Sequence, residues 1–94
     1  MFTFVQTCGA CPEQYDVYMD DDLKTRVAYV RLRHGLFRVD CPPGGESVFA
    51  AEPPGADGIF VSDEQRQNYL ALACHAILLK QASVPYVPFK VIYE

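Results

Sequence analysis

The chain has 94 residues, of which 50% are hydrophobic, and a formal net charge of −4. A chain of this length builds one domain around a single modest core, so we expect residues 1–94 to fold as one unit. Its longest apolar segment, residues 69–79, is interrupted by His75 and falls far short of the roughly 20 residues that a membrane span needs. The acidic balance weighs against direct nucleic-acid binding, which usually requires a basic surface.

The N-terminal residues 1–5 have neither the basic stretch nor the small-residue cleavage site of a secretory signal. We therefore expect a soluble cytoplasmic protein. In that compartment cysteines are usually free thiols or metal ligands, and disulfides are rare.

The first half of the chain has the alternating pattern of short β-strands. Strands are expected over residues 2–7, 15–19 and 27–32, with shorter ones over 36–40 and 47–51. Turn-forming residues separate them, which favours an antiparallel meander of four to five strands.

The segment 33–35 has two interpretations. The apolar positions are even up to Leu32 and odd from Phe37 onward, so the inward face changes phase by one residue. A hairpin turn there would leave Cys41 at the opposite end of the sheet from Cys8. A bulge would instead continue one long strand and bring these two cysteines to the same end. The sequence leaves both open.

Residues 62–81 are predicted to form an amphipathic helix. Ser62 and Gln65 match a capping box, in which Ser62 accepts a bond from the Gln65 amide and the Gln65 side chain reaches back to the Ser62 amide. The expected inward stripe consists of Leu70, Ala73, Cys74 and Ile77. Four further residues widen the apolar surface: Tyr69, Leu72, Ala76 and Leu79. So broad an apolar surface predicts a helix covered on more than one side.

The tail, residues 83–94, contains two prolines and then the apolar run 89–93. Proline is tolerated at sheet edges and strand starts, so we expect an extended segment that ends in an edge strand. An edge left unpaired offers its backbone to a second copy, which makes a homodimer through this strand a candidate assembly. The predicted fold class is α+β, an antiparallel meander packed by one C-terminal helix and followed by this strand.

The cysteine pair Cys8 and Cys11 has the spacing that lets two thiolates converge on one zinc ion. Cys41, followed by two prolines and two glycines, resembles the start of a second such turn and is the expected third ligand. His34 is the expected fourth, with Cys74 and His75 as the alternatives. A zinc-stabilised structural or adaptor domain is one hypothesis that follows.

Other interpretations of the cysteines remain open. All four can be ordinary thiols, with Cys74 buried in the core. The pair Cys8 and Cys11 can also act as a redox dithiol, although a strand and not an activating helix is expected after it. No other catalytic motif is present, so we expect a protein that is not an enzyme.

Protein binding is the leading hypothesis. Tyrosines supply large, rigid contact area, and we single out Tyr18 and Tyr29 together with the acidic run Asp20, Asp21 and Asp22 as partner-binding residues. A basic cluster at Arg31, Arg33, His34 and Arg38 is interpreted as solvated strand positions opposite an apolar face.

Residues 8–15, with 30–35 and 37–39, resemble a group of small uncharacterised proteins of phages and mobile elements. The resemblance implies a second Cys-x-x-Cys near Cys41, from which this chain departs at Gly44. By analogy it implies an inhibitor of host defence, such as an anti-CRISPR protein. Such an inhibitor would cover a surface or a nucleic-acid channel of a larger host protein or ribonucleoprotein.

Overall fold

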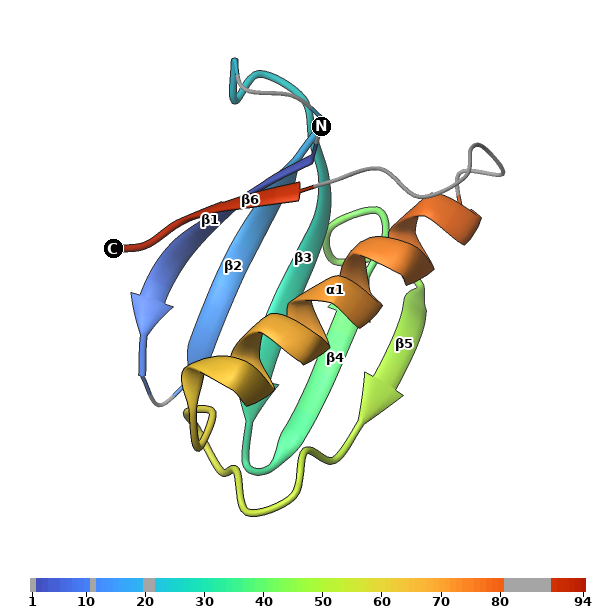
Figure 1. Cartoon of the computed structure of the whole chain (residues 1–94). Coiled ribbons are helices and arrows are strands. Elements are labelled where there is room, and N and C mark those ends of the chain that lie inside the picture. Colours follow the sequence, from blue (N-terminus) through green and yellow to red (C-terminus); the bar gives the residue numbers. More distant parts are fainter. Residues whose placement is uncertain (1, 11, 20–21, 81–88) are drawn as a thin grey trace.

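The computed structural model describes residues 2–10, 12–19, 22–80 and 89–94 (Figure 1). Its elements, in chain order, are β1 (Phe2–Gly9), β2 (Glu13–Tyr18), β3 (Arg26–Arg33), β4 (Leu36–Asp40), β5 (Ser47–Ala51), α1 (Asp63–Lys80) and β6 (Phe89–Ile92). The α+β class expected from the sequence is confirmed, including the single helix after the first five strands.

All six strands of the described residues form one sheet, in the order β5-β4-β3-β2-β1-β6. The first five strands are an antiparallel meander, whereas β6 pairs with β1 in parallel. The sheet therefore has one strand more than expected and is mixed. The C-terminal edge strand pairs with its own sheet, and self-association through it stays a prediction.

A tight hairpin joins β3 to β4. Arg33 pairs with Leu36, and the two residues between them, His34 and Gly35, have φ values of 53° and 80°. Two consecutive positive φ angles are typical of a type I′ turn, which fits the twist of the flanking strands. The hairpin interpretation of residues 33–35 is therefore confirmed, and the change of phase follows from pairing even with odd positions.

The helix lies across one side of the sheet and leaves the other side uncovered (Figure 1). Its expected inward stripe is confirmed, because Leu70, Ala73, Cys74 and Ile77 are all buried, together with Leu78. Opposite them the strands contribute the largest buried side chains, Phe4, Tyr15, Leu32 and Phe37. Phe37 is central, since its ring contacts those of Phe49, Phe60 and Tyr69.

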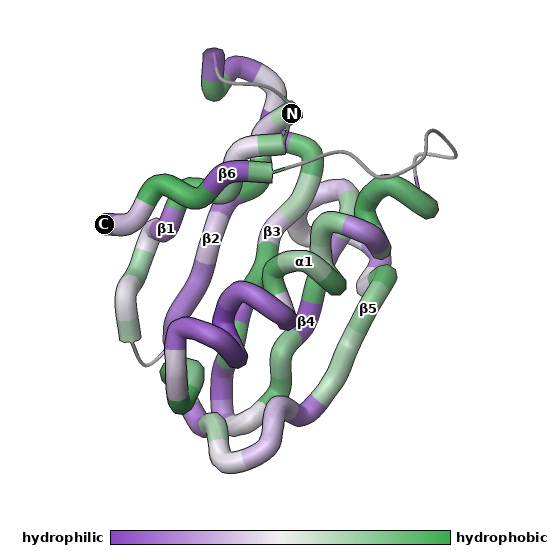
Figure 2. Tube along the Cα trace, viewed as in Figure 1, coloured by the Kyte–Doolittle hydropathy of each residue, from purple (hydrophilic) through white to green (hydrophobic). Residues whose placement is uncertain are grey.

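The outer side of α1 differs from the expectation. Leu72 and Leu79 are 45% and 68% exposed, because the sheet covers the helix from one side. The first turns of α1 are hydrophilic and the last turns hydrophobic (Figure 2). No helix in the described part of the chain is both long and apolar enough to cross a membrane.

The start of α1 is capped, with one change from the predicted pattern. The Ser62 hydroxyl accepts the Gln65 amide at 3.0 Å, as expected. The Gln65 side chain, however, accepts the amide of Val61 at 3.0 Å instead of that of Ser62, and donates to the carbonyl of Pro54 at 2.9 Å. Gln65 thereby ties the preceding loop to the helix.

Candidate functional site

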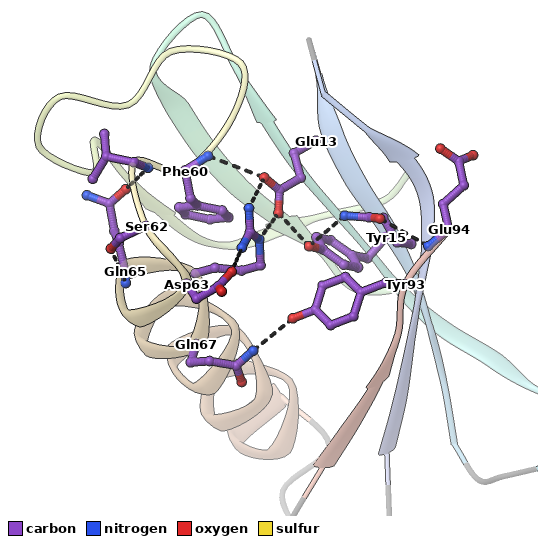
Figure 3. A network of polar contacts seen from close by, with 12 residues as sticks. Glu13, Tyr15, Phe60, Ser62, Asp63, Gln65, Gln67, Tyr93 and Glu94 are labelled. Atoms are coloured by element: carbon purple, nitrogen blue, oxygen red, sulfur yellow. Dashed lines mark hydrogen bonds and ion pairs between the residues drawn. The ribbon is translucent and has the colours of Figure 1, made fainter.

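A buried ionic network joins the start of β2 to the first turn of α1 (Figure 3). Glu13 is fully buried, and both of its oxygens accept bonds from the Arg66 guanidinium, at 2.6 and 3.2 Å. The Glu13 carboxylate also accepts the Phe60 amide at 3.2 Å and the Tyr15 hydroxyl. A buried carboxylate needs this many donors, because desolvation otherwise disfavours its charge.

The network reaches the surface through amide side chains. Gln6 donates to the Tyr15 hydroxyl at 3.1 Å and accepts the Glu94 amide at 3.1 Å. Nearby, Gln67 donates to the Tyr93 hydroxyl at 2.8 Å, which links α1 to the residue after β6 (Figure 3). Gln6, Gln67 and Tyr93 line a shallow depression over this end of the molecule.

The electrostatics of the network favour a structural role. Burial, together with the bond to Glu13, raises the pKa of the Tyr15 hydroxyl far above its ordinary value. The same carboxylate raises the pKa of Arg66 by hydrogen bonding. Among the described residues, no buried side-chain nitrogen or oxygen lacks a hydrogen-bond partner. The buried polar atoms of the network all have hydrogen-bond partners, and the Tyr15 hydroxyl stays protonated at neutral pH. The network therefore connects the helix to the sheet and has the features of a structural element.

The uncovered side of the sheet offers a different kind of surface, which we name the open face. In the described part of the chain, no helix or strand lies over it. The register places the following side chains on it: Thr3, Val5, Gln14, Asp16, Tyr18, Arg26, Tyr29, Arg31, Arg33, Leu36, Arg38, Asp40, Ala50, Lys90 and Ile92. Tyrosine and arginine, which are enriched at protein interfaces, thus lie beside exposed Leu36 and Ile92.

The predicted partner-binding residues fall into two groups. Tyr18 and Tyr29 lie on neighbouring strands of the open face, where both are partly buried, and the Tyr29 hydroxyl donates to Gln14 at 2.6 Å. Asp22 is exposed in the connection between β2 and β3. Asp20 and Asp21 lie outside the described residues. The structure therefore brings the two tyrosines together on one surface.

Charge is unevenly distributed over the molecule. Four of the five arginines lie on the open face. The predicted placement opposite the apolar side is confirmed for Arg31, Arg33 and Arg38, whereas His34 lies in the hairpin turn and not in a strand.

Two of the four open-face arginines are paired, Arg26 with Asp16 at 3.1 Å and Arg38 with Asp40 at 3.2 Å. The other two open-face arginines, at positions 31 and 33, form no ion pair within the described residues. The open face is thus locally basic on an acidic protein.

The expected zinc ligands are not gathered at one place. Cys8 lies level with Arg38, three strands away, and Cys41 follows Arg38 by three residues. At strand spacings of about 4.8 Å and rises of about 3.3 Å, Cys8 and Cys41 lie roughly 17 Å apart. Ligands of one zinc ion lie within about 4 Å of each other, since each sits about 2.3 Å from the metal. Cys41 cannot share a metal with Cys8.

The remaining candidate ligands lie at different places. His34 lies at the Cys8 end of the sheet, where it lines a depression with Pro12. Cys74 is buried in the core, and His75 lies on the exposed side of α1 near β5. Cys11 lies outside the described residues. Among those described, no group of three or more His, Cys, Asp or Glu side chains could hold a metal ion. Zinc binding stays a prediction.

The described cysteines, Cys8, Cys41 and Cys74, form no disulfide bond. The Cys8 thiol donates to the Ala10 carbonyl at 3.3 Å. Burial raises the pKa of Cys74 to about 11 and also raises the pKa of Cys41. A redox thiol needs a lowered pKa, so these two buried cysteines are poor nucleophiles at neutral pH.

The network of Glu13 and Arg66 was not anticipated from the sequence, although two signals indicate it. Glu13 shares the odd positions of β2 with Tyr15 and Val17, which are buried. Arg66 precedes Leu70 by one helical turn, on the inward stripe of α1. A carboxylate and a guanidinium on facing apolar surfaces are expected to pair.

Comparison with known protein families, with curated proteins and with solved structures finds no match to this chain.

Proposed function

We propose that this protein is a non-enzymatic protein-binding module whose contact surface is the open face of its sheet. A single observation carries the proposal: one side of the sheet buries the core under α1, while on the other side no helix of the described residues packs over Tyr18, Tyr29 and the arginines. Sheets packed on one side normally carry scattered polar residues on the other. Here that surface also holds tyrosine and arginine, two residue types that are enriched at protein interfaces.

Rigidity supports this assignment. The open face is built on the central strands β2, β3 and β4, whose opposite side chains are fully buried. A surface held by such strands loses little conformational entropy when it binds, which favours affinity. The bond from Tyr29 to Gln14 also fixes one of the two tyrosine side chains before binding.

The test is a comparison of captured partners. The double variant Tyr18→Ala/Tyr29→Ala and the wild type are immobilised and exposed to a lysate of the host, and captured proteins are quantified by mass spectrometry. We expect the double variant to lose the partner that the wild type retains. Matching thermal melts and circular dichroism spectra would show that the variant is folded.

A matched control removes apolar side chains from the opposite side of the molecule. Leu72→Ala/Leu79→Ala truncates two exposed leucines of α1 and should retain the partner. If the open-face variant captures the same partner as the wild type, the contact surface is elsewhere and the proposal is wrong.

Within this class we propose a cytoplasmic phage inhibitor of a host defence nuclease complex, on the resemblance of residues 8–15. Addition of the purified protein to such a complex should stop cleavage of target DNA. Asp22→Lys in the exposed acidic connection should weaken inhibition if this connection competes for a basic nucleic-acid channel. Cleavage that continues at a saturating concentration of the protein would contradict this class.

A further inference from the structure

We propose that Arg31, Arg33 and Arg38, here named the arginine strip, form a site that binds carboxylate side chains of an acidic segment in the partner protein. The inference rests on the proposed function and specifies the chemistry of the partner. It concerns the β3–β4 half of the open face, away from Tyr18.

The first step concerns repulsion within the free protein. Arg31 and Arg38 are direct partners on adjacent antiparallel strands and therefore point to the same side. Like charges in this position destabilise a sheet. Asp40 neutralises Arg38 through two contacts, at 3.2 and 3.3 Å, and no acid of the described residues pairs with Arg31. Within the described residues, Arg31 is thus a cation that no carboxylate neutralises.

The second step concerns shape. The three arginines line one surface depression together with His34 and Leu36. Leu36 is 42% exposed and adds an apolar side chain to the lining beside the charges. A guanidinium binds a carboxylate with two parallel hydrogen bonds, and a partly shielded site strengthens such bonds. The depression is suited to acidic side chains that alternate with apolar ones.

The third step separates an acidic protein from a nucleic acid. The whole chain has a net charge of −4, which repels a long nucleic acid more strongly than a short acidic segment with fewer charges. Asp16 also lies on the open face, where it would face the phosphates of a strand that crosses the sheet. A short acidic segment avoids Asp16 by contacting Arg31 and Arg33, which pair with no acid of the described residues. The charge pattern therefore favours carboxylates of a protein.

The experiment compares the binding of a carboxylate probe with that of a phosphate probe. A fluorescein-labelled decaglutamate peptide and a labelled oligothymidylate of equal length are titrated with the full chain, with fluorescence anisotropy as the readout. We expect the peptide to bind more tightly, and its affinity to fall between about 50 and 200 mM NaCl.

The variants test whether position matters beyond total charge. Arg31→Gln/Arg33→Gln should weaken peptide binding about tenfold, because two exposed charge contacts are lost. The control Lys24→Gln/Lys80→Gln removes the same charge from exposed sites elsewhere and should change binding by less than about twofold.

Three outcomes would overturn the inference: no peptide binding, equal weakening by both variants, or tighter binding of the oligothymidylate. The proposed function has a separate test, since partner capture depends on Tyr18 and Tyr29. If capture requires the tyrosines while Arg31→Gln/Arg33→Gln captures the partner as the wild type does, only the arginine strip is wrong. If neither variant affects capture, both proposals fail.

Discussion

The two faces of the sheet are made by the same strands and differ in what they hold. On the covered face even a charged residue, Glu13, is enclosed, and both of its carboxylate oxygens accept hydrogen bonds. On the open face, no acid of the described residues pairs with Arg31. Where burial is complete, unpaired charge is too costly to persist, whereas exposed strands tolerate it. The covered face accordingly determines most of the stability, and substitutions on the open face should change stability less.

The largest expected effect comes from breaking the ionic network of the covered face. Glu13→Leu removes the buried carboxylate partner of the largely buried Arg66, which keeps an ion pair with the exposed Asp63, and leaves the Phe60 amide without an acceptor. Removal of one partner of a buried ion pair costs about 3–5 kcal/mol of unfolding free energy. Urea denaturation followed by circular dichroism measures the loss.

The matched control for this prediction replaces both partners. Glu13→Leu/Arg66→Leu should recover a large part of the stability, because an apolar pair removes the guanidinium that lost its buried partner. A double variant as unstable as the single one would show that Arg66 is not the source of the loss.

The second prediction concerns alkaline pH. The folded state raises the pKa of the Cys74 thiol from 9.0 to about 11, so it holds a proton that the unfolded chain releases. The resulting stabilisation is complete below pH 9 and is lost as the pH rises toward 11. The urea midpoint should therefore be lower at pH 10.5 than at pH 8. Cys74→Ala should show a smaller difference than the wild type, and an equal difference would assign the effect to other groups such as Tyr15.

The third prediction concerns the helix start. Ser62→Ala removes the acceptor of the Gln65 amide and should cost about 1 kcal/mol. Thermal melts measure the change. Ser62→Asp keeps an acceptor at the same position and serves as the control, with stability close to that of the wild type.

A smaller effect of opposite sign is expected on the open face. Arg31→Gln relieves the repulsion with Arg38 and should raise the melting temperature by about 1–4 °C, on a gain of about 0.2–0.5 kcal/mol. The rise should disappear in a high concentration of NaCl, which screens the charges. A fall in melting temperature would mean that Arg31 stabilises the free protein and would remove the repulsion argument.

The last prediction is that one cysteine substitution leaves the zinc content unchanged. Cys41 lies too far from Cys8 to share a metal with it, so Cys41→Ser should leave the zinc content of the purified protein as it is. Mass spectrometry of metals measures this content. Cys8→Ser is the companion variant, and a loss of zinc in it alone would assign a site to the Cys8 end of the sheet.

The strands and the helix could be predicted because their signals are local. Alternation in β2 and β3 marks the inward residues, and the capping pattern at Ser62 marks the helix start. The hairpin was encoded in the change of phase after His34, because a two-residue turn pairs even with odd positions. A bulge would explain the same change of phase, so the sequence left both interpretations open and the pairing of Arg33 with Leu36 decided between them.

The remaining features depend on which elements meet. The sequence indicates a strand over residues 89–92 but not that its neighbour is β1. It also does not show that a single helix covers the sheet from one side only, which is why Leu72 and Leu79 were expected to be covered. The open face follows from that one-sided packing, so its role as a surface could not be read from local pattern.

The pairing of β1 with β6 has a consequence for how the chain reaches its fold. Phe2 pairs with Phe89, and the rings of Phe4 and Phe89 lie 5.2 Å apart, although 86 residues separate Phe2 from Phe89 in the sequence. Contacts so distant in sequence close a long loop and slow folding. β1 can therefore pair with β2 as soon as these two strands have been synthesised, whereas its second neighbour is made only with residues 89–92.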